Sequence, residues 1–226
     1  MNPQRLNKYL ATNFGVSRRE ADILIQKGAV RINGQMAEIG QRVFDGDKVE
    51  LDGKEVIQQE LVYLILNKPV GYVCSRKRQG DVPTIYELLP KELKSLKSVG
   101  RLDKDSSGLI LMTNDGDFAF QMTHPKFYKT KKYTVMLDRE LEPLHQQMIA
   151  DFGINLTDGI SKMELVRLDE GRLRWDVTLH EGRNRQIRRT FEALGYKVVA
   201  LHRYQFDSYT LSGLEPGKWE KTKKII

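Results

Sequence analysis

Short apolar runs, each followed by a turn, are the sequence feature that most constrains the fold of this chain. The run "LVYLIL" at residues 61–66 leads into a Lys-Pro-Val-Gly turn and a second expected strand, and "GLILMTN" at 108–114 leads into an Asp-Gly turn. Runs of this length fit strands that are buried in a sheet, and they are far too short to span a bilayer. We therefore expect a soluble protein with a sheet in its core.

Strand patterns outnumber helix patterns in the rest of the chain beyond residue 60. Further strands are expected at 131–137, 162–168, 172–180 and 196–206, the second and third of these as an antiparallel pair. Helices are expected at 84–90, 118–125, 140–152 and 184–195, the last with Ile187, Phe191 and Leu194 toward the core and Gly195 as its cap. Because many strands follow one another directly, we predict an α+β fold with a mixed, mainly antiparallel sheet.

The first part of the chain has the pattern of a small helix–hairpin unit. Two short helices are expected, and Ser17 and Glu20 have the spacing of a capping box at the start of the second. "AVRING" and "DKVEL" then fit short strands beside Asn-Gly and Asp-Gly turns. The polar stretch at 53–60 has no periodic apolar pattern, so we place a boundary there and expect domains over 1–58 and 61–226.

The charge of the chain favours a polyanionic partner, although it also fits simple solubility. The formal net charge is +7, and the isoelectric point is near 9.3. Residues 1–31 carry six basic and two acidic side chains, a balance of +4, whereas residues 32–60 have a balance of −4. The N-terminal unit is therefore polarised, and its basic face is a candidate for contact with RNA phosphates.

Several kinds of site have no signal in the sequence. The single Cys74 excludes an intramolecular disulfide and a cysteine-based zinc cluster. The four histidines lack metal-ligand spacing, and no phosphate-binding glycine loop or Gly-x-Ser-x-Gly turn is present. We expect no metal, no small-molecule cofactor, no secretion signal and no membrane partner, with a cytoplasmic monomer as the default.

Three stretches carry residues that are suited to chemistry. Asp103 in "GRLDKDSSGL" lies between two cations just before a buried strand, Tyr133 in "KTKKYTV" opens a strand, and four arginines in "HEGRNRQIRR" crowd a helix start, where an anion is favoured. Singly, each residue would more often be structural. Arg188 follows the buried Ile187 and can reach inward. Because a half-buried arginine needs a carboxylate, we predict that it contacts Asp103.

These motifs resemble known families. "RLNKYL", "SRREADILIQKGAVRING" and "VFDGDKVEL", within residues 5–52, resemble an S4 domain, an RNA-binding module. The three stretches, in this order behind an S4 domain, resemble the RsuA-type RNA pseudouridine synthases, which modify bacterial ribosomal RNA. They match the Arg-Leu-Asp, tyrosine and arginine motifs of that family, with Ser106 where threonine is common. "LEPGKWEKT" resembles the closing Pro-Gly-x-Trp segment, so the resemblance covers nearly the whole chain.

The resemblance implies that uracil is detached from its ribose, turned and rejoined through carbon, without a redox change. Asp103 would be the essential ionised carboxylate, and whether it attacks the sugar, attacks the base or removes a ribose proton stays open. Arg188 would keep the pKa of Asp103 low, Tyr133 would pack on the uracil, and Arg101 would hold the flipped nucleotide. Further substrate contacts are expected from Lys131, Lys132, Arg183, Arg185 and Arg189. The S4 contacts to ribosomal RNA are expected from Arg5, Lys8, Arg18, Arg19 and Lys27.

Two other classes of function remain as alternatives. A non-catalytic RNA-binding or ribosome-assembly factor could retain this fold, but it would not need an intact Asp–Tyr–Arg set. Another RNA enzyme with an S4 domain, such as a methyltransferase, would need a glycine-rich cofactor loop, which the sequence lacks. "RLNKYL", "SRREAD" and "GRLDKDS" are more similar to the large-subunit members of the family, which favours 23S over 16S ribosomal RNA.

Overall fold

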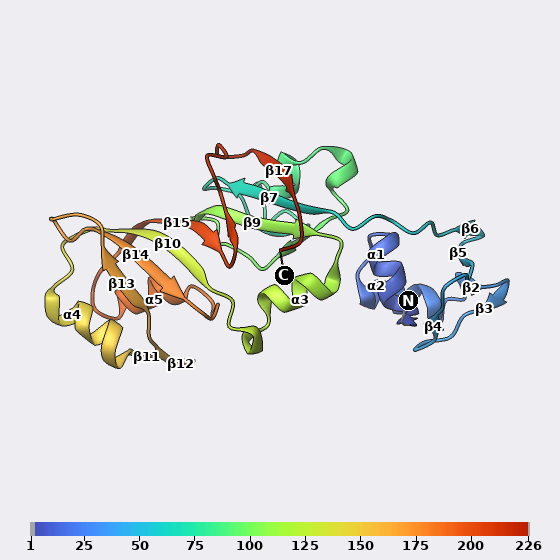
Figure 1. Cartoon of the computed structure of the whole chain (residues 1–226), viewed down its shortest axis with the longest axis horizontal. Coiled ribbons are helices and arrows are strands. Elements are labelled where there is room, and N and C mark those ends of the chain that lie inside the picture. The colour runs from blue at the N-terminus through green and yellow to red at the C-terminus, as the bar shows by residue number, and fades with distance from the viewer. Residues whose placement is uncertain (1–2, 226) are drawn as a thin grey trace.

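The chain folds into two units joined by an extended segment (Figure 1), in a computed structural model that describes residues 3–225. Within those residues, no helix is both long and apolar enough to cross a membrane. The first unit has its own apolar core, formed by buried residues between Leu6 and Val56. The cores of the second unit begin at Leu64 and Ile65.

The N-terminal unit is a helix pair packed on short strands. α1 (Leu6–Asn13) and α2 (Arg18–Gln26) precede a small sheet with the strand order β3-β2-β5-β6. The predicted capping box is confirmed: the Ser17 hydroxyl accepts from the amide of Glu20 at 3.1 Å, and the Glu20 carboxylate accepts from the amide of Ser17 at 2.7 Å. The strands are β1 (Gln4–Arg5), β2 (Val30–Ile32), β3 (Gln35–Met36), β4 (Arg42–Val43), β5 (Val49–Leu51) and β6 (Lys54–Glu55).

The C-terminal unit is built around one mixed sheet. Its strand order is β13-β14-β10-β15-β9-β7-β17, and every neighbouring pair is antiparallel except β15 with β9. The prediction of an α+β fold with a mainly antiparallel sheet is therefore confirmed. The strands are β7 (Tyr63–Lys68), β8 (Lys97–Val99), β9 (Ser107–Thr113), β10 (Lys131–Leu137), β13 (Glu164–Arg167), β14 (Arg174–Leu179), β15 (Val198–Phe206), β16 (Tyr209–Thr210) and β17 (Trp219–Thr222).

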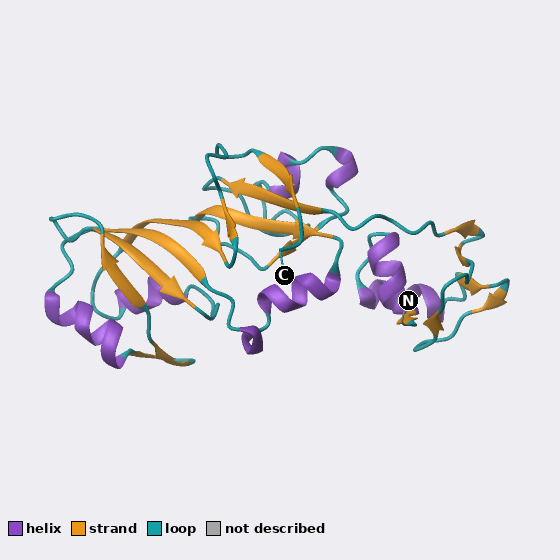
Figure 2. Ribbon diagram, viewed as in Figure 1, coloured by secondary structure: helices purple, strands orange, loops and turns teal. Residues whose placement is uncertain are grey.

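The main helices of this unit lie on one side of the sheet. In the view of Figure 2, α3 (Gly116–Thr123), α4 (Pro143–Gln147) and α5 (Gln186–Glu192) are all below the strands. α4 continues as a π-helical turn over Met148–Phe152 and is followed by the hairpin of β11 (Ile154–Leu156) and β12 (Gly159–Ser161). Short 3₁₀ turns occupy Ile85–Leu88, Lys91–Leu93 and Pro125–Phe127.

One predicted strand is wrong. The segment after the Lys-Pro-Val-Gly turn is a loop, in which Val73 makes only an isolated bridge to Thr84. The reason is that β7 already pairs with β9 on one side and with β17 on the other, so no edge of β7 is free to take another strand.

The two halves of the sheet meet at a close approach between β9 and β15. The parallel pairing covers only Ser107 with His202 and Gly108 with Arg203. Gly108 has φ +112°, and a Cβ atom there would lie 2.2 Å from the carbonyl oxygen of Arg203. Glycine is thus the residue that allows this junction.

Candidate functional site

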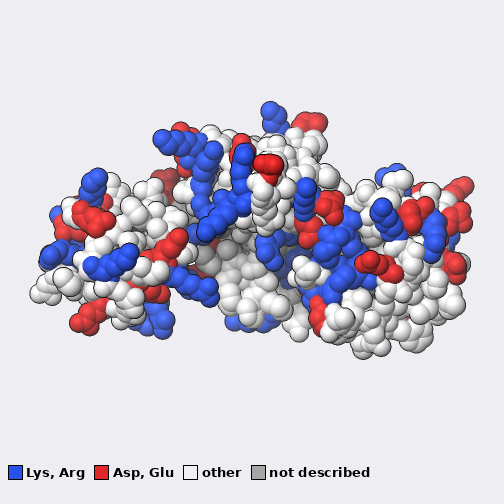
Figure 3. Space-filling model, turned by 180° about the vertical axis from the view of Figure 1, so that it is seen from behind, with Lys and Arg blue, Asp and Glu red and all other residues white. Residues whose placement is uncertain are grey.

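A cleft of about 700 Å³ opens at the junction of the two half-sheets. Its walls come from the loop before β9, the strands β10 and β15, and the loop that leads into α5. Asp103, Tyr133 and Arg185, from the three stretches singled out in the sequence, all line it. Seen from behind, lysine and arginine side chains gather along the middle of the molecule, around a hollow (Figure 3).

The loop that carries Asp103 is held by a buried lysine. Lys68, at the end of β7, is fully buried, and its ammonium donates to the carbonyls of Ser106 at 2.5 Å and Lys104 at 3.4 Å. The amide of Gly71 donates to the same Lys104 carbonyl at 2.9 Å. Burial lowers the pKa of Lys68, while Cys74, Asp103 and Asp105 oppose that shift. The "NKPVG" stretch therefore holds the loop that carries Asp103 in place, through Lys68 and Gly71.

The arginine that faces Asp103 is Arg185, and the predicted contact with Arg188 is wrong. Arg185 Nη1 lies 3.6 Å from Asp103 Oδ2 and 3.4 Å from Asp105 Oδ2. Arg188 instead donates to two main-chain carbonyls, of Val198 at 2.7 Å and of Asp105 at 2.9 Å. Carbonyl oxygens thus take the place of a carboxylate for the two terminal nitrogens, while the buried Nε has no hydrogen-bond partner among the described residues. Arg188 ties the Asp103 loop to β15.

The backbone at the start of α5 explains why Arg185, and not Arg188, faces Asp103. The helix begins at Gln186, and Arg185 caps it in the left-handed conformation with φ +46°. That backbone geometry turns the Arg185 side chain to the cleft, one turn ahead of Arg188. Helical spacing alone could not predict this, because Arg185 lies outside the helix.

Tyr133 lies in the cleft wall and in the main apolar core. Its side chain is only 8% exposed. On β10 it pairs with Val177 of β14 and with Arg203 of β15. A ring held between two strands keeps a fixed position, as packing against a flat base requires.

The other predicted substrate residues divide into two groups. Arg101, Lys131 and Arg183 line the cleft with Asp103. Lys132 and Arg189 are not among the residues that line it. Lys132 is next to Lys131 on a strand, so its side chain points to the opposite face of the sheet. Arg189 grips Asp158 with both terminal nitrogens, at 3.1 and 2.7 Å, and so braces α5 against the β11–β12 turn.

The basic residues of the N-terminal unit remain largely on its surface. Arg5, Arg18, Arg19 and Lys27 are exposed. Lys8 is the exception, because its ammonium pairs with Asp117 at the start of α3 in the other unit. Lys8 therefore contributes to the contact between the units, and the remaining four are exposed to solvent.

Sequence reasoning missed two buried cations at this site, Lys68 and Arg203. Arg203 is 2% exposed and also lines the cleft. It lies two residues after Leu201 on β15, at a position that points into the protein. A charged residue at an inward position of a strand is the signal that could have identified it. Burying a charge costs free energy unless the charge is paired or hydrogen-bonded, so such a residue indicates a specific interaction.

Comparison with known proteins identifies the family of both units. Residues 62–193 match the family described as RNA pseudouridylate synthase, and residues 4–49 match the S4 domain. The chain is 36% identical to the ribosomal large subunit pseudouridine synthase B of Bacillus subtilis (strain 168) over 95% of this chain and 90% of that protein. It is 38% identical to the ribosomal small subunit pseudouridine synthase A of Pasteurella multocida (strain Pm70), over 92% and 90%.

A solved structure supports the same conclusion. A crystal structure of a pseudouridylate synthase superposes with a TM-score of 0.69 at 35% identity, covering 97% of this chain and 96% of that one. Fold, cleft and relatives together define an RNA-modifying isomerase that has an RNA-binding module ahead of its catalytic domain. The chain belongs to the RsuA-type family of RNA pseudouridine synthases with an N-terminal S4 domain.

Proposed function

We propose that this enzyme converts a specific uridine of ribosomal RNA to pseudouridine, with Asp103 as the essential carboxylate. The observation that carries the proposal is the meeting of Asp103, Tyr133 and Arg185 in one cleft, although they are far apart in the sequence. Both named relatives act, by their names, on a ribosomal subunit. A ribosomal substrate would place the enzyme in the cytoplasm, and the two proposed domains over 1–58 and 61–226 would divide binding from chemistry.

The reaction breaks the bond from the ribose C1′ to N1 of uracil and forms a bond from C1′ to C5. The C5 proton is lost and N1 gains one, so no atom or electron is supplied from outside. Asp103 attacks the sugar or the base, or removes a ribose proton. Arg185 supplies a positive charge beside that carboxylate at 3.6 Å, and Tyr133 packs on the ring and helps to take the C5 proton.

The target uridine must leave its stack to reach this cleft. Flipping costs a few kcal/mol, and contacts of the cleft and S4 cations with phosphates offset that cost. Arg101 is exposed at the cleft edge, beside the Asp103 loop, where it can hold the strand opened by the flip.

The test is a map of pseudouridine in ribosomal RNA from cells with and without this gene. One site, in 23S rather than 16S RNA by our proposal, should lose pseudouridine in the deletion and regain it when the wild-type chain is restored. Unchanged ribosomal pseudouridine in the deletion would reject the proposal. A non-catalytic assembly factor would leave pseudouridine intact while ribosome assembly slows, which distinguishes that alternative.

A further inference from the structure

Two buried cations share the floor of the cleft beside Tyr133. Lys131 is 9% exposed and Arg203 is 2% exposed, and both line the cleft. They come from neighbouring strands and lie against one aromatic ring: Lys131 Nζ is 5.1 Å and Arg203 Cζ is 4.9 Å from the centre of Phe206. Two positive charges are therefore concentrated around one side chain.

Neither cation is neutralised by the protein. Lys131 donates to the carbonyl of Lys129 at 2.9 Å, and Arg203 donates through Nε and Nη2 to the carbonyl of Leu109 at 2.9 and 2.7 Å. Among the ion pairs of the described residues, none joins either cation to a carboxylate. An arginine has five N–H donors, so part of the Arg203 guanidinium remains available to a ligand.

The nearest carboxylates are already engaged. Asp207 pairs with Lys129 at 2.9 Å, and Glu181 pairs with Arg183 at 3.1 Å. Burial, and then the charge of Arg203, lower the pKa of Lys131 to about 8, and Asp207 and Glu181 oppose this only in part. The free protein thus tolerates a buried pair of like charges, which costs stability unless something compensates it.

An anionic ligand is the compensation that fits. The substrate of this enzyme is a polyanion, and Lys131 is two residues from Tyr133 on the same face of β10, roughly 7 Å along the strand. The anion would therefore lie beside the uracil rather than under it. We propose that Lys131 and Arg203 bind a phosphate of the RNA backbone next to the flipped uridine; this assignment rests on the proposed function.

Other charged groups around Lys131 set the background for a pH test. They comprise two histidines, two acids and three other cations. These neighbours are His124, Lys129, His180, Glu181, Arg183, Arg203 and Asp207. Because the pKa of Lys131 is lowered to about 8, its own charge changes between pH 7 and 9.

The experiment uses the full-length enzyme and two small probes, uridine and uridine 3′,5′-bisphosphate, with binding measured by calorimetry at pH 7 and pH 9. We expect the bisphosphate to bind at least about tenfold more tightly than uridine at pH 7. That preference should fall severalfold at pH 9, because Lys131 loses its proton through pH 8, and binding at pH 8 should take up protons from the buffer.

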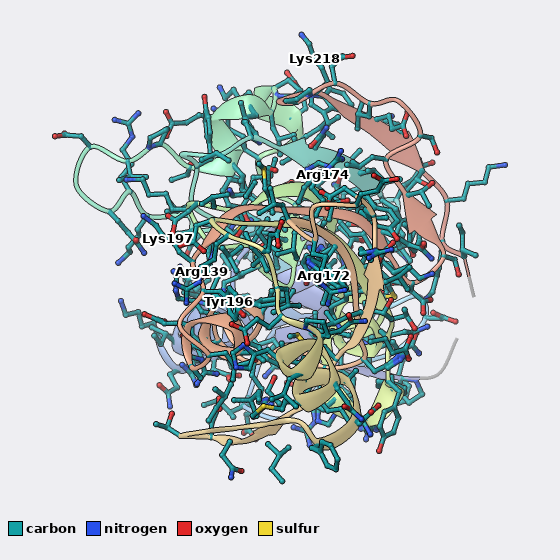
Figure 4. All side chains as sticks on the ribbon, turned by 90° about the vertical axis from the view of Figure 1, so that its left-hand side faces the viewer. Arg139, Arg172, Arg174, Tyr196, Lys197 and Lys218 are labelled. Carbon is teal, nitrogen blue, oxygen red and sulfur yellow. The ribbon has the colours of Figure 1, made fainter. Side chains whose placement is uncertain are left out.

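Variants connect the effect to Lys131. Lys131→Met should abolish the phosphate preference, and it should not lower the melting temperature, because it removes a buried charge with an apolar side chain of similar length. Lys131→Arg should keep the preference at both pH values and show no proton uptake. Lys197→Met is the matched control, since Lys197 is exposed at the far end of the catalytic domain, close to Arg139 (Figure 4).

Several results would reject the phosphate site. Equal affinity of the wild type for the two probes would do so, as would a Lys131→Met enzyme that keeps the preference or a Lys197→Met enzyme that loses it. These outcomes are separate from the proposed function. Phosphate binding through Lys131 without a ribosomal pseudouridine would leave the site standing and reject the ribosomal substrate, and the reverse combination would reject only the site.

Discussion

At the scale of single residues, the geometry of the proposed active site depends on which oxygen atoms each arginine contacts. The Asp103 side chain is 32% exposed, and among the described residues its ion pair is with Arg185, which lies almost equally close to Asp105. That contact is a point charge against two carboxylates. Arg188, by contrast, uses its two terminal nitrogens on two separate carbonyls. The two arginines therefore differ in what a substitution should remove.

Asp103→Asn should abolish pseudouridine formation, a loss of at least about 100-fold, while the fold is retained. Asparagine keeps the shape of the side chain but can neither act as a base nor attack carbon. Tritium release from C5-labelled RNA measures the rate, and circular dichroism checks the fold. Substantial turnover by a folded Asp103→Asn enzyme would show that Asp103 is not the essential carboxylate.

Arg185→Lys should be tolerated better than Arg188→Lys. A lysine ammonium can replace the single charge of Arg185 near Asp103, but it cannot span the carbonyls of Val198 and Asp105, and breaking each of these charge-assisted bonds costs about 1.5–3 kcal/mol. We expect a decrease of less than about tenfold in kcat/KM for Arg185→Lys and a larger one, with a lower melting temperature, for Arg188→Lys. A larger loss of kcat/KM for Arg185→Lys than for Arg188→Lys would contradict this assignment of the two arginines.

At the scale of elements, the catalytic sheet depends on the short junction of β9 and β15. Two parallel residue pairs connect its halves, and the loop with Asp103 enters β9 directly before them. The walls on the two sides of the cleft are therefore connected through this junction. Gly108 allows it, because any side chain there would meet the main chain of Arg203.

Gly108→Ala should destabilise the enzyme by at least about 2 kcal/mol, from the positive φ and from the clash between strands. Denaturant unfolding measures the free energy of unfolding. Gly213→Ala is the matched control, because Gly213 has φ +84° but no atom within 4 Å of the added Cβ. Equal destabilisation of the two variants would mean that the backbone conformation, and not the close approach, accounts for the effect.

At the scale of the whole molecule, the S4 domain is docked on the catalytic domain through part-buried and exposed polar contacts. Lys97 of β8 donates to the carbonyls of Ala11 at 3.2 Å and Val16 at 2.8 Å, at the end of α1 and in the turn after it. Lys8 pairs with Asp117 across the same contact. The docking pairs Lys8 with Asp117 and brings Arg18 close to Gly116, while Arg18 and the other basic residues of the helix pair remain exposed.

The double variant Arg18→Ala/Arg19→Ala should weaken RNA binding without changing the chemistry on bound RNA. Removing one cation that binds a phosphate makes the slope of log K against log salt shallower by about 0.7–0.9. Filter binding at several salt concentrations measures the slope, and single-turnover rates at saturating enzyme measure the chemistry. An unchanged slope would remove these two residues from the RNA interface.

The sequence by itself predicted most of the elements and their order. Local patterns placed the capping box at Ser17, the buried strand at 108–114 and the strand that begins at Lys131, because periodicity and turn residues act over a few neighbours. The three motifs identified Asp103 and Tyr133 as candidates without any view of the cleft.

Only the tertiary structure decided which distant residues meet. Arg185 displaced Arg188 beside Asp103 because its left-handed backbone lies outside the helical spacing. The strand expected after Val70 did not form because β9 and β17 had taken both edges of β7. Arg203 entered the cleft because β15 pairs with β9, where its guanidinium donates to the carbonyl of Leu109, 94 residues earlier in the chain. Such contacts depend on edges and faces that elements offer one another only after they pack, so no local pattern records them.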